Sequence, residues 1–393
     1  MASPFADPAF YRDRYPLYTA LRESSPVLQV PMDGATGTAA VVTGYSQARA
    51  ALADAALSKD ATRFFAERPS GRSLHPALSE TMLNSDPPDH TRLRRLVTRA
   101  FTPATVDRLS PYISALAEQL VDGWSPGQRV DLIEELAMPL PVTVICQLLG
   151  VPAADRDRVR HWSADLVATG DSRRIDAASH ELAHYMAELV EAKRNEPDQA
   201  LLSALVAVRD SDDDRLAEQE LISLALLLLI AGHETTTSAI GNAVLALLRH
   251  PDQLALLRAD PRRIVGAVDE LLRYDSPVSI ATWRWAPAPT RIGDARVPAG
   301  NPVFVSPGAA NRDPDRFPDP DRLDLDRNAR SHLAFGHGIH RCLGAPLAQL
   351  EIQITLRVLL ERFPGLRLAE PADRLPWRHS RLVRGLEALP VLL

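Results

Sequence analysis

Apolar residues recur at helical spacing through much of the middle of the chain. From about Thr102 to Leu272 they mostly return every third or fourth position, as in VDRLSPYISALAEQLVDGW and SRRIDAASHELAHYMAELVEAKR, a spacing typical of amphipathic helices. After Cys342, the segment LGAPLAQLEIQITLRVLLERF predicts another long amphipathic helix, which ends before Pro364. These parts of the chain are predicted to be helical.

Strand-like patterns are fewer and shorter. TAAVVTGY in the N-terminal third and VSIATWRWAPAPTRIGDARVPAGNPVFVS, residues 278–306, predict strands and turns. The proline-rich segment NRDPDRFPDPDRLDLDR, residues 311–327, has neither pattern and predicts irregular backbone. We therefore expect one compact domain over residues 1–393, mainly α with a smaller β portion.

The strongest apolar run, LISLALLLLIA, continues through residue 250 to a stop at Pro251, which predicts a helix over 221–250. Because it is apolar almost all round, this helix should be buried. The uninterrupted apolar run itself, residues 221–231, is too short to cross a bilayer, which needs about 20 apolar residues. Ala217 stands where a Ser or Thr cap is expected at the helix entry.

Polar groups interrupt the middle of this apolar helix at Gly232, Glu234 and Thr235, with two further threonines after them. A carboxylate and several hydroxyls in a buried helix cost free energy unless they are well paired or used chemically. The pattern alone leaves both interpretations open, either a satisfied polar kink or a reactive site.

The two cysteines have different surroundings. Cys146 lies within the apolar segment VTVICQLLG, whereas Cys342 lies in FGHGIHRCLG, among glycines, histidines and an arginine. No second thiol near Cys342 is available for a zinc site. A single sulfur in a glycine-rich loop suits the sole protein ligand of a large, flat cofactor. If Cys342 opens the helix that follows, its thiolate is favoured by unpaired amides and the helix dipole.

Charge and composition narrow the class of protein. Lys and Arg number 44 against 50 Asp and Glu, for a net charge of −6, which does not indicate a nucleic-acid partner. Two cysteines indicate a reducing compartment. The start of the chain lacks a basic stretch followed by an apolar one, so we expect no signal peptide or membrane anchor and a cytoplasmic protein.

The pattern Phe335-x-x-Gly338-x-His340-x-Cys342-x-Gly344 resembles the haem-binding signature of cytochrome P-450 enzymes. The resemblance implies that the Cys342 thiolate is the axial ligand of haem b, iron protoporphyrin IX. It also implies the cytochrome P-450 fold, with the haem between the long central helix and the cysteine-loop helix. Gly338 and Gly344 would let the backbone approach the ring, and Phe335 would cover the sulfur.

Ala231-Gly232-His233-Glu234-Thr235 resembles the oxygen-activating motif of the same family. There the acid and the alcohol relay protons to dioxygen. The resemblance implies that Glu234 connects to solvent protons, that Thr235 donates the hydrogen bond on the oxygen side, and that the missing side chain of Gly232 leaves room for oxygen.

Haem propionates need cationic partners, and four residues in matching segments are candidates. His90 and Arg94 are spaced i and i+4 on one face of a predicted helix. Arg284 and His340 match further propionate contacts of the family. Ordinary surface charge is the alternative for each arginine.

Two further sets of residues follow from the resemblance. Glu270 and Arg273 match the family's Glu-x-x-Arg element, and Arg322 is the candidate for the arginine that joins them. The substrate pocket is expected to be mostly apolar. Its candidates are Leu227, Ile230, Ala231, Val278, Ile280, Thr282, Leu382 and Val383, with the regions 64–83 and 166–173.

The implied function is a monooxygenase that hydroxylates or epoxidises a bulky hydrophobic molecule, such as a macrolide or another polyketide. It would use O2 and electrons derived from NAD(P)H through a ferredoxin reductase and a ferredoxin, which would dock near Arg95, Arg99 and Arg341. We expect a monomer with no membrane or nucleic-acid partner. The alternatives are a haem-thiolate enzyme that couples phenols or rearranges its substrate, and a haem sensor without turnover.

Overall fold

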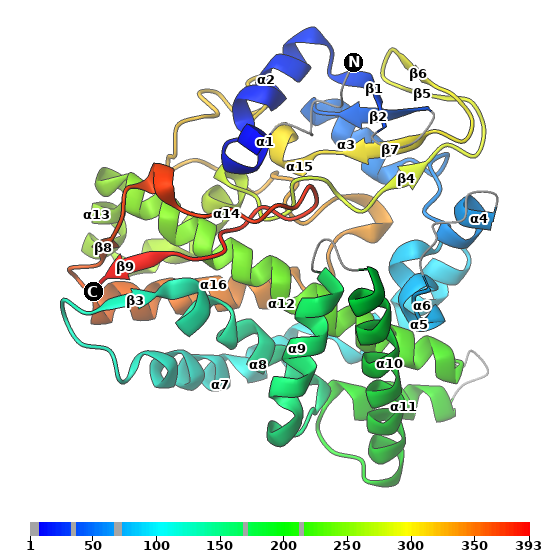
Figure 1. Cartoon of the computed structure of the whole chain (residues 1–393), viewed down its shortest axis with the longest axis horizontal. Helices are drawn as coiled ribbons and strands as arrows, with labels where there is room; N and C mark the ends of the chain where they lie inside the picture. Colours follow the sequence, from blue (N-terminus) through cyan, green and yellow to red (C-terminus); the bar gives the residue numbers. More distant parts are fainter. Residues whose placement is uncertain (1–7, 33–36, 67–72, 168–171, 212–215) are drawn as a thin grey trace. The chain divides into compact units, whose positions relative to one another are not determined.

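The computed structural model of the protein describes residues 8–32, 37–66, 73–167, 172–211 and 216–393. Figure 1 traces the helices and strands from the N-terminus to the C-terminus. Contacts divide the chain into two compact units, each assembled from separate segments. Unit 1 comprises residues 1–58, 111–140 and 235–393, and unit 2 comprises residues 59–110 and 141–234. A single domain over residues 1–393 stays a prediction.

Unit 1 contains the β portion of the molecule. Its main sheet has the order β1-β2-β7-β4, in which only β2 and β7 run parallel. The buried residues of β2 and β7 pack on α3, and this cluster includes Val42, Val305 and Leu52. The strands of this sheet are β1 (Val27–Pro31), β2 (Thr38–Val42), β4 (Arg284–Trp285) and β7 (Pro302–Val305). A second sheet has the order β3 (Arg129–Asp131), β9 (Pro390–Leu392), β8 (Arg367–Leu368). A third consists of the two strands β5 (Thr290–Ile292) and β6 (Ala295–Val297).

Unit 1 also contains several helices and the segment that carries Cys342. The helices are α1 (Pro8–Arg12), α2 (Tyr15–Ser24), α3 (Tyr45–Ala53), α13 (Pro251–Ala259), α14 (Ile264–Tyr274), α15 (Pro307–Ala310) and α16 (Ala345–Arg362), with the short helical turns η3 (Ile133–Ala137), η5 (Pro261–Arg263), η6 (Gly338–His340) and η7 (Ala372–Arg374). Helix α14 packs against α16. The expected long helix after Cys342 is confirmed as α16, and the irregular backbone predicted for residues 311–327 is confirmed, since residues 311–337 contain no helix or strand.

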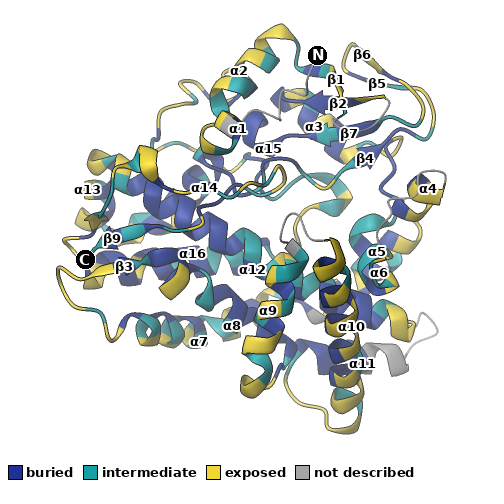
Figure 2. Cartoon of the chain, in the orientation of Figure 1, coloured by how far each residue is buried: buried dark blue, intermediate teal, exposed yellow. Residues whose placement is uncertain are grey.

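Unit 2 is helical in its described part. Its helices are α4 (Ala61–Ala66), α5 (Pro76–Ser79), α6 (Asp89–Ala100), α9 (Arg156–Val167), α10 (Ser172–Asn195) and α11 (Leu201–Ser211), with the short turns η2 (Met82–Asn84) and η4 (Ala153–Asp155). Helix α10 packs against α9 and α11 through buried residues such as Leu182 and Met186. Its opposite face is exposed, as the yellow ribbon of α10 in Figure 2 shows.

Three helices run from one unit into the other along the chain: α7 (Pro103–Val121), α8 (Pro139–Leu149) and α12 (Glu218–Arg249). The predicted helix 221–250 is confirmed as α12, but it begins three residues earlier. The Glu220 carboxylate accepts a hydrogen bond from the Ala217 amide at 2.8 Å, so a glutamate satisfies the helix entry without a Ser or Thr cap.

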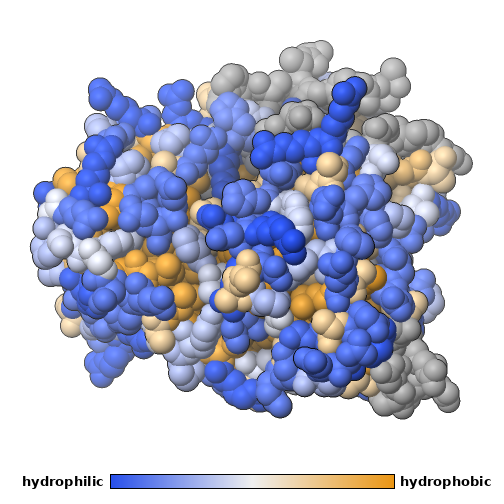
Figure 3. Space-filling view, turned by 60° about the horizontal axis from the view of Figure 1, so that its bottom comes forward, coloured by the Kyte–Doolittle hydropathy of each residue, from blue (hydrophilic) through white to orange (hydrophobic). Residues whose placement is uncertain are grey.

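By length and composition α12 could cross a membrane, but 61% of its most apolar window is buried inside the protein, as in the core helix of a globular protein. The exposed large hydrophobic residues of the described part are scattered: Phe65, Val265, Ile339 and Leu382. Polar residues cover most of the face drawn in Figure 3, with smaller apolar areas between them.

Candidate functional site

The loop that presents Cys342 is closed by its own backbone. The Cys342 amide donates to the Phe335 carbonyl at 2.9 Å, and the Arg341 amide donates to Gly338 at 3.1 Å. The Cys342 side chain is exposed. Helix α16 begins at Ala345 with Gly344 as its N-cap residue, so the expectation that Cys342 opens this helix was wrong by three residues. The sulfur is presented by a tight loop and lies just before the helix.

Glycine is needed at two positions of the loop, for a different structural reason at each. Gly338 has φ of +76°, and a Cβ atom there would lie 2.8 Å from the Leu52 carbonyl of α3, so only glycine fits. A Cβ atom on Gly344 would instead lie 4.0 Å from the Cys342 Sγ. Glycine therefore keeps the space beside the sulfur open at Gly344, which suits a flat group bound through that sulfur.

The chemistry of this donor set fits a haem iron. One accessible thiol in a glycine loop provides a single soft ligand. Among the residues that the structure describes, no group of three or more His, Cys, Asp or Glu side chains could hold a bare metal ion. The other thiol, Cys146, is buried, and burial raises its pKa to about 11.

A chain of hydrogen bonds connects the Cys342 segment to α14. The Asn311 side chain accepts from the Leu333 amide at 2.7 Å and donates to the Ser276 hydroxyl at 2.7 Å. Its backbone carbonyl accepts from Arg273 of α14 at 2.9 Å. The start of the loop that carries Cys342 is thus held at Leu333 by the end of α14 and the turn that follows it.

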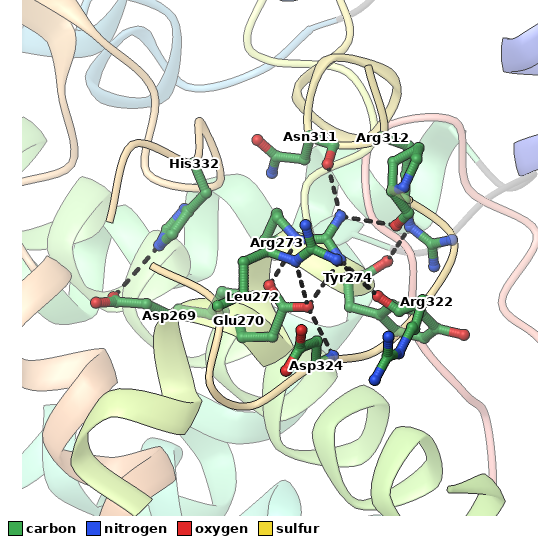
Figure 4. Close-up of polar contacts among 12 residues, drawn as sticks. Asp269, Glu270, Leu272, Arg273, Tyr274, Asn311, Arg312, Arg322, Asp324 and His332 are labelled. Carbon is green, nitrogen blue, oxygen red and sulfur yellow. Dashed lines mark hydrogen bonds and ion pairs between the residues drawn. The ribbon is translucent and has the colours of Figure 1, made fainter. Parts of the chain in front are cut away.

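Glu270 and Arg273 form the buried ion pair at the centre of this network (Figure 4). Both side chains are 0% exposed, and Arg273 Nε donates to Glu270 Oε2 at 2.6 Å. The prediction for Arg322 was wrong in its chemistry. Arg322 contributes its carbonyl oxygen, which accepts from Arg273 at 3.2 Å, whereas the second guanidinium that reaches Glu270 is that of Arg327, at 3.3 Å.

A second contact of α14 also reaches this segment. Asp269 Oδ1 lies 3.5 Å from Nε2 of His332, and Figure 4 shows the two side chains pointing toward one another. The hydrogen bond with His332 lowers the pKa of the Asp269 carboxyl. Neighbouring acids of α14, Asp269 and Glu270, therefore anchor two separate parts of the irregular segment before Cys342.

On α12, the oxygen-motif residues lie where the otherwise buried helix is incompletely covered. Ala231 is exposed, and Glu234 and Thr235 are half-buried, whereas Thr236 and Thr237 are buried. Leu227 and Ile230 are also only half-buried. Residues 227, 230, 231 and 234 follow helical spacing, so the less covered positions share one face of α12.

Gly232 has a structural use that the sequence did not reveal. A Cβ atom at this position would lie 3.0 Å from Cδ1 of Ile145 in α8. The space left by the missing side chain is therefore taken up by a packed isoleucine. The packing of α8 therefore gives a reason for glycine at this position, and the expectation that Gly232 leaves room for oxygen stays a prediction.

His233, which the sequence analysis left without a role, makes three short contacts. Its Nδ1 lies 2.8 Å from the Leu229 carbonyl, and its Nε2 lies 3.3 Å from the Ser163 Oγ of α9. The same Nε2 lies 3.5 Å from Oε1 of Glu234. No sequence signal identifies Ser163 as the partner, because it belongs to another helix.

The cationic candidates fall into two sets. In unit 1, Arg284 is buried and donates to the Leu52 and Thr282 carbonyls at 3.3 Å, and His340 is half-buried in η6. In unit 2, His90 of α6 is buried and Arg94 is half-buried.

Lys59 is a buried cation near His90 that the sequence analysis missed. Its side chain is 2% exposed. Burial and the charges of Arg94 and Lys59 lower the pKa of His90, while Asp86 opposes this shift. Two cationic side chains, Lys59 and Arg94, beside the imidazole of His90 suit an anionic group such as a propionate. A lysine in a short loop gives no sequence signal of burial, so only the structure identifies it.

Two of the predicted pocket segments pair directly within unit 1. Val278 and Val383 form an isolated antiparallel bridge, and the Ser279 amide donates to the Leu382 carbonyl at 2.8 Å. Leu382 is 53% exposed and Thr282 is also exposed, whereas Ile280 is 5% exposed and packs as a core residue. Residues 67–72 and 168–171 of the expected pocket regions lie outside the described residues.

A polar cavity of about 260 Å³ lies beside the Cys342 loop in unit 1. Its wall is rich in cationic and imidazole side chains, and its charged and ring residues include Arg49, Arg330, Arg341, His332, His337 and Asp269. Burial and the charges of Arg49 and Arg341 lower the pKa of His337. The cavity wall therefore has a positive balance of charge.

A family model, related sequences and solved structures all match this chain to the same family. Residues 157–377 match the family model described as Cytochrome P-450. The chain is 48% identical to cytochrome P-450 107B1 of Saccharopolyspora erythraea, over 98% of this chain and 96% of that protein. It is 43% identical to 6-deoxyerythronolide B hydroxylase of the same organism, over 98% and 97%. The solved structure of the tirandamycin C-bound P-450 monooxygenase TamI matches with a TM-score of 0.91 and 44% identity, over 98% and 99%.

Proposed function

Since the chain belongs to the cytochrome P-450 family and is a haem-dependent monooxygenase, we propose that its substrate is a bulky hydrophobic secondary metabolite such as a macrolide or another polyketide. The cofactor is haem b, and the reaction uses O2 and electrons derived from NAD(P)H. The observation that carries the substrate proposal is the similarity, over nearly the whole chain, to relatives whose names specify 6-deoxyerythronolide B and tirandamycin C.

The uncovered apolar residues of each unit are consistent with such a substrate. On α12 these residues are Leu227, Ile230 and Ala231. In unit 1 the exposed Leu382 lies next to Val383, which pairs with Val278. Apolar groups left in contact with water gain free energy when a hydrophobic ligand covers them. These residues are proposed to line the substrate site.

The proposed roles of the chain's residues divide into holding the cofactor and moving protons. Bound haem supplies a thiolate-ligated iron, whose electron-rich ligand favours cleavage of the O–O bond. Cys342 is proposed to provide that thiolate. His90, Arg94, Arg284 and His340 would bind the propionates, together with Lys59 as an additional charge.

Glu234 and Thr235 are proposed to deliver protons to the reaction. The carboxylate of Glu234 can take a proton from water and return it, and the hydroxyl of Thr235 can donate one hydrogen bond while it accepts another. Both side chains are only half-buried on α12, so each is accessible to a small molecule beside this helix.

Ligand-induced spin-state change tests the substrate proposal. We expect the ferric protein to shift from low spin to high spin when titrated with 6-deoxyerythronolide B, tirandamycin C or a related polyketide. The physical reason is that a ligand that fills the apolar site displaces water from the iron. The measurement is the haem absorption spectrum over the titration, in parallel with a steroid, a terpenoid and a fatty acid.

Product mass then tests the reaction. Monooxygenation of the responsive compound adds one oxygen atom, whereas phenol coupling or rearrangement does not. A saturable shift with a steroid or a fatty acid and none with a polyketide would overturn the substrate proposal while leaving the monooxygenase assignment in place.

Thr235→Ala is expected to uncouple electron consumption from product formation. Removal of the hydroxyl leaves haem binding and substrate affinity intact but takes away a proton donor. Proton-transfer groups typically contribute about 10²- to 10⁴-fold to rate, so most of the NADH should be diverted to peroxide. NADH consumed, peroxide released and product formed are measured together. Tight coupling in Thr235→Ala would refute the proton-delivery role, and Thr236→Ala, a buried neighbour on the same helix, is the matched control.

A ferredoxin is the proposed electron donor, and the cationic cavity beside the Cys342 loop supports this. Its side chains Arg49, Arg330 and Arg341 would attract acidic groups of such a partner. In unit 2, Arg95 and Arg99 of α6 are exposed and are proposed as further candidates for contact with acidic groups of such a partner. A ferredoxin donor is consistent with a cytoplasmic location, and a monomer stays a prediction.

A further inference from the structure

His233 lies at the junction of α12 and α9. Its side chain is 3% exposed, and its Nδ1 lies 2.8 Å from the carbonyl oxygen of Leu229, one helical turn earlier. A carbonyl oxygen can only accept, so Nδ1 must carry a hydrogen and donate it. This bond fixes the plane of the ring, so only Nε2 can differ in protonation.

Two neighbours compete for Nε2, and they favour different protonation states. The Ser163 Oγ lies 3.3 Å away and the Glu234 Oε1 lies 3.5 Å away. In neutral His233, Nε2 is an acceptor and is satisfied by the Ser163 hydroxyl. In protonated His233, Nε2 is a donor and interacts favourably with the ionised Glu234 carboxylate.

Ser163 has an alternative partner that permits this exchange. Its hydroxyl also lies 3.0 Å from the Arg160 carbonyl of the same helix, α9. When Nε2 donates, the Ser163 proton can turn to Arg160, so no buried polar group loses its partner in either state. The same heavy-atom positions therefore accommodate both protonation states of His233.

We propose that His233 is a positioning residue for the proton-delivering carboxylate: it bridges Ser163 of α9 and Glu234 of α12, and so sets the orientation of the carboxylate according to the position of α9. This inference rests on the proposed proton-delivery role of Glu234. His233 acts on the reaction only through Glu234. A displacement of Ser163 would change which of the two neighbours interacts with Nε2.

The test uses three variants and one matched control in the haem-loaded enzyme. His233→Phe keeps a buried ring but removes both nitrogens, His233→Gln keeps hydrogen bonding but cannot be protonated, and Ser163→Ala removes only the α9 partner. His250→Gln is the control, because His250, directly after the end of α12, makes the same type of contact, 2.7 Å from the Ala246 carbonyl.

The assay needs no known substrate. NADH oxidation is driven by a surrogate ferredoxin and its reductase, without added ligand, and peroxide released per NADH is measured in H2O and in D2O. We expect His233→Phe to raise the peroxide fraction and to change the solvent isotope effect, with a drop of about tenfold in water formation, the lower range for loss of an outer hydrogen-bond partner. His233→Gln and Ser163→Ala should change both quantities in the same direction by less.

A purely structural role predicts a different result. Loss of packing alone would lower haem content or stability in His233→Phe but would leave the solvent isotope effect unchanged. An unchanged isotope effect and an unchanged peroxide fraction in His233→Gln and Ser163→Ala would overturn the proposal, even if His233→Phe fails to fold.

Glu234→Gln separates this inference from the proposed function. If Glu234→Gln leaves the peroxide fraction unchanged, proton delivery by Glu234 is refuted and the inference is refuted with it. If Glu234→Gln raises the peroxide fraction but the His233 and Ser163 variants match His250→Gln, only the positioning role of His233 is overturned.

Discussion

Cys342→Ser is expected to abolish thiolate-ligated haem and all oxygen insertion. Serine occupies the same loop position, but its hydroxyl is not ionised at neutral pH and is a poor ligand for the iron. The loop itself should persist, because its closure uses the Cys342 backbone amide at 2.9 Å from the Phe335 carbonyl, which the substitution keeps. The measurement is the absorption spectrum of the reduced, carbon-monoxide-bound protein together with product formation.

Cys146→Ala is the matched control for this prediction. Cys146 is buried in α8, and burial keeps its thiol neutral by raising its pKa to about 11. Its removal should leave the thiolate spectrum unchanged and lower only the stability, by the small loss of packing expected of a buried thiol. Retention of the thiolate spectrum in Cys342→Ser, or its loss in Cys146→Ala, would contradict the assignment of the ligand.

The sequence predicted the helical elements well where periodicity was strong. The apolar runs that form α12 and α16 have helical spacing and are followed by Pro251 and Pro364. Interactions between residues close in sequence are therefore enough to determine these two helices. The start of α16 was less accurate, because the turn η6 and the bond between residues 342 and 335 compete with helix for the same amides. Local competition of this kind has no periodic signal.

Contacts between distant segments could not be predicted from the sequence. The second arginine that reaches Glu270, beside Arg273, is Arg327 and not Arg322, because a segment without periodicity turns so that Arg322 presents its carbonyl oxygen. Gly232 faces Ile145 of α8, and His233 faces Ser163 of α9. In each case the sequence identified the position on one element but contained no information on which side chain of another element lies against it.

Arg273→Leu is expected to lower the free energy of unfolding by about 3–5 kcal/mol, the range for removing one partner of a buried ion pair. All five N–H groups of Arg273 are used: two bind Glu270, and the others bind the carbonyls of Asn311, Pro320 and Arg322. The substitution leaves the Glu270 carboxylate and these carbonyls without their main donor. Since the whole protein is stabilised by only about 5–15 kcal/mol, this variant should express poorly.

Arg273→Lys makes the prediction measurable if the leucine variant does not fold. Lysine keeps the charge but has only three N–H groups, all on one atom, so it cannot donate hydrogen bonds to Glu270 and to all three carbonyls at once. Its urea midpoint should fall between those of the wild type and Arg273→Leu. Arg291→Lys is the matched control, because Arg291 pairs with Asp294 at i and i+3 on the surface, where such pairs contribute little.

The same variant should also weaken haem retention, because Arg273 holds the Asn311 carbonyl and the Asn311 side chain holds the Leu333 amide at the start of the Cys342 loop. Haem loss to an excess of a haem-scavenging apoprotein measures this directly. Faster haem loss in Arg273→Lys than in Arg291→Lys would connect the buried ion pair of α14 with the position of the sulfur. If Arg273→Lys lowers the midpoint but loses haem at the wild-type rate, the network stabilises the fold without positioning the loop. An unchanged midpoint would refute the stabilising role itself.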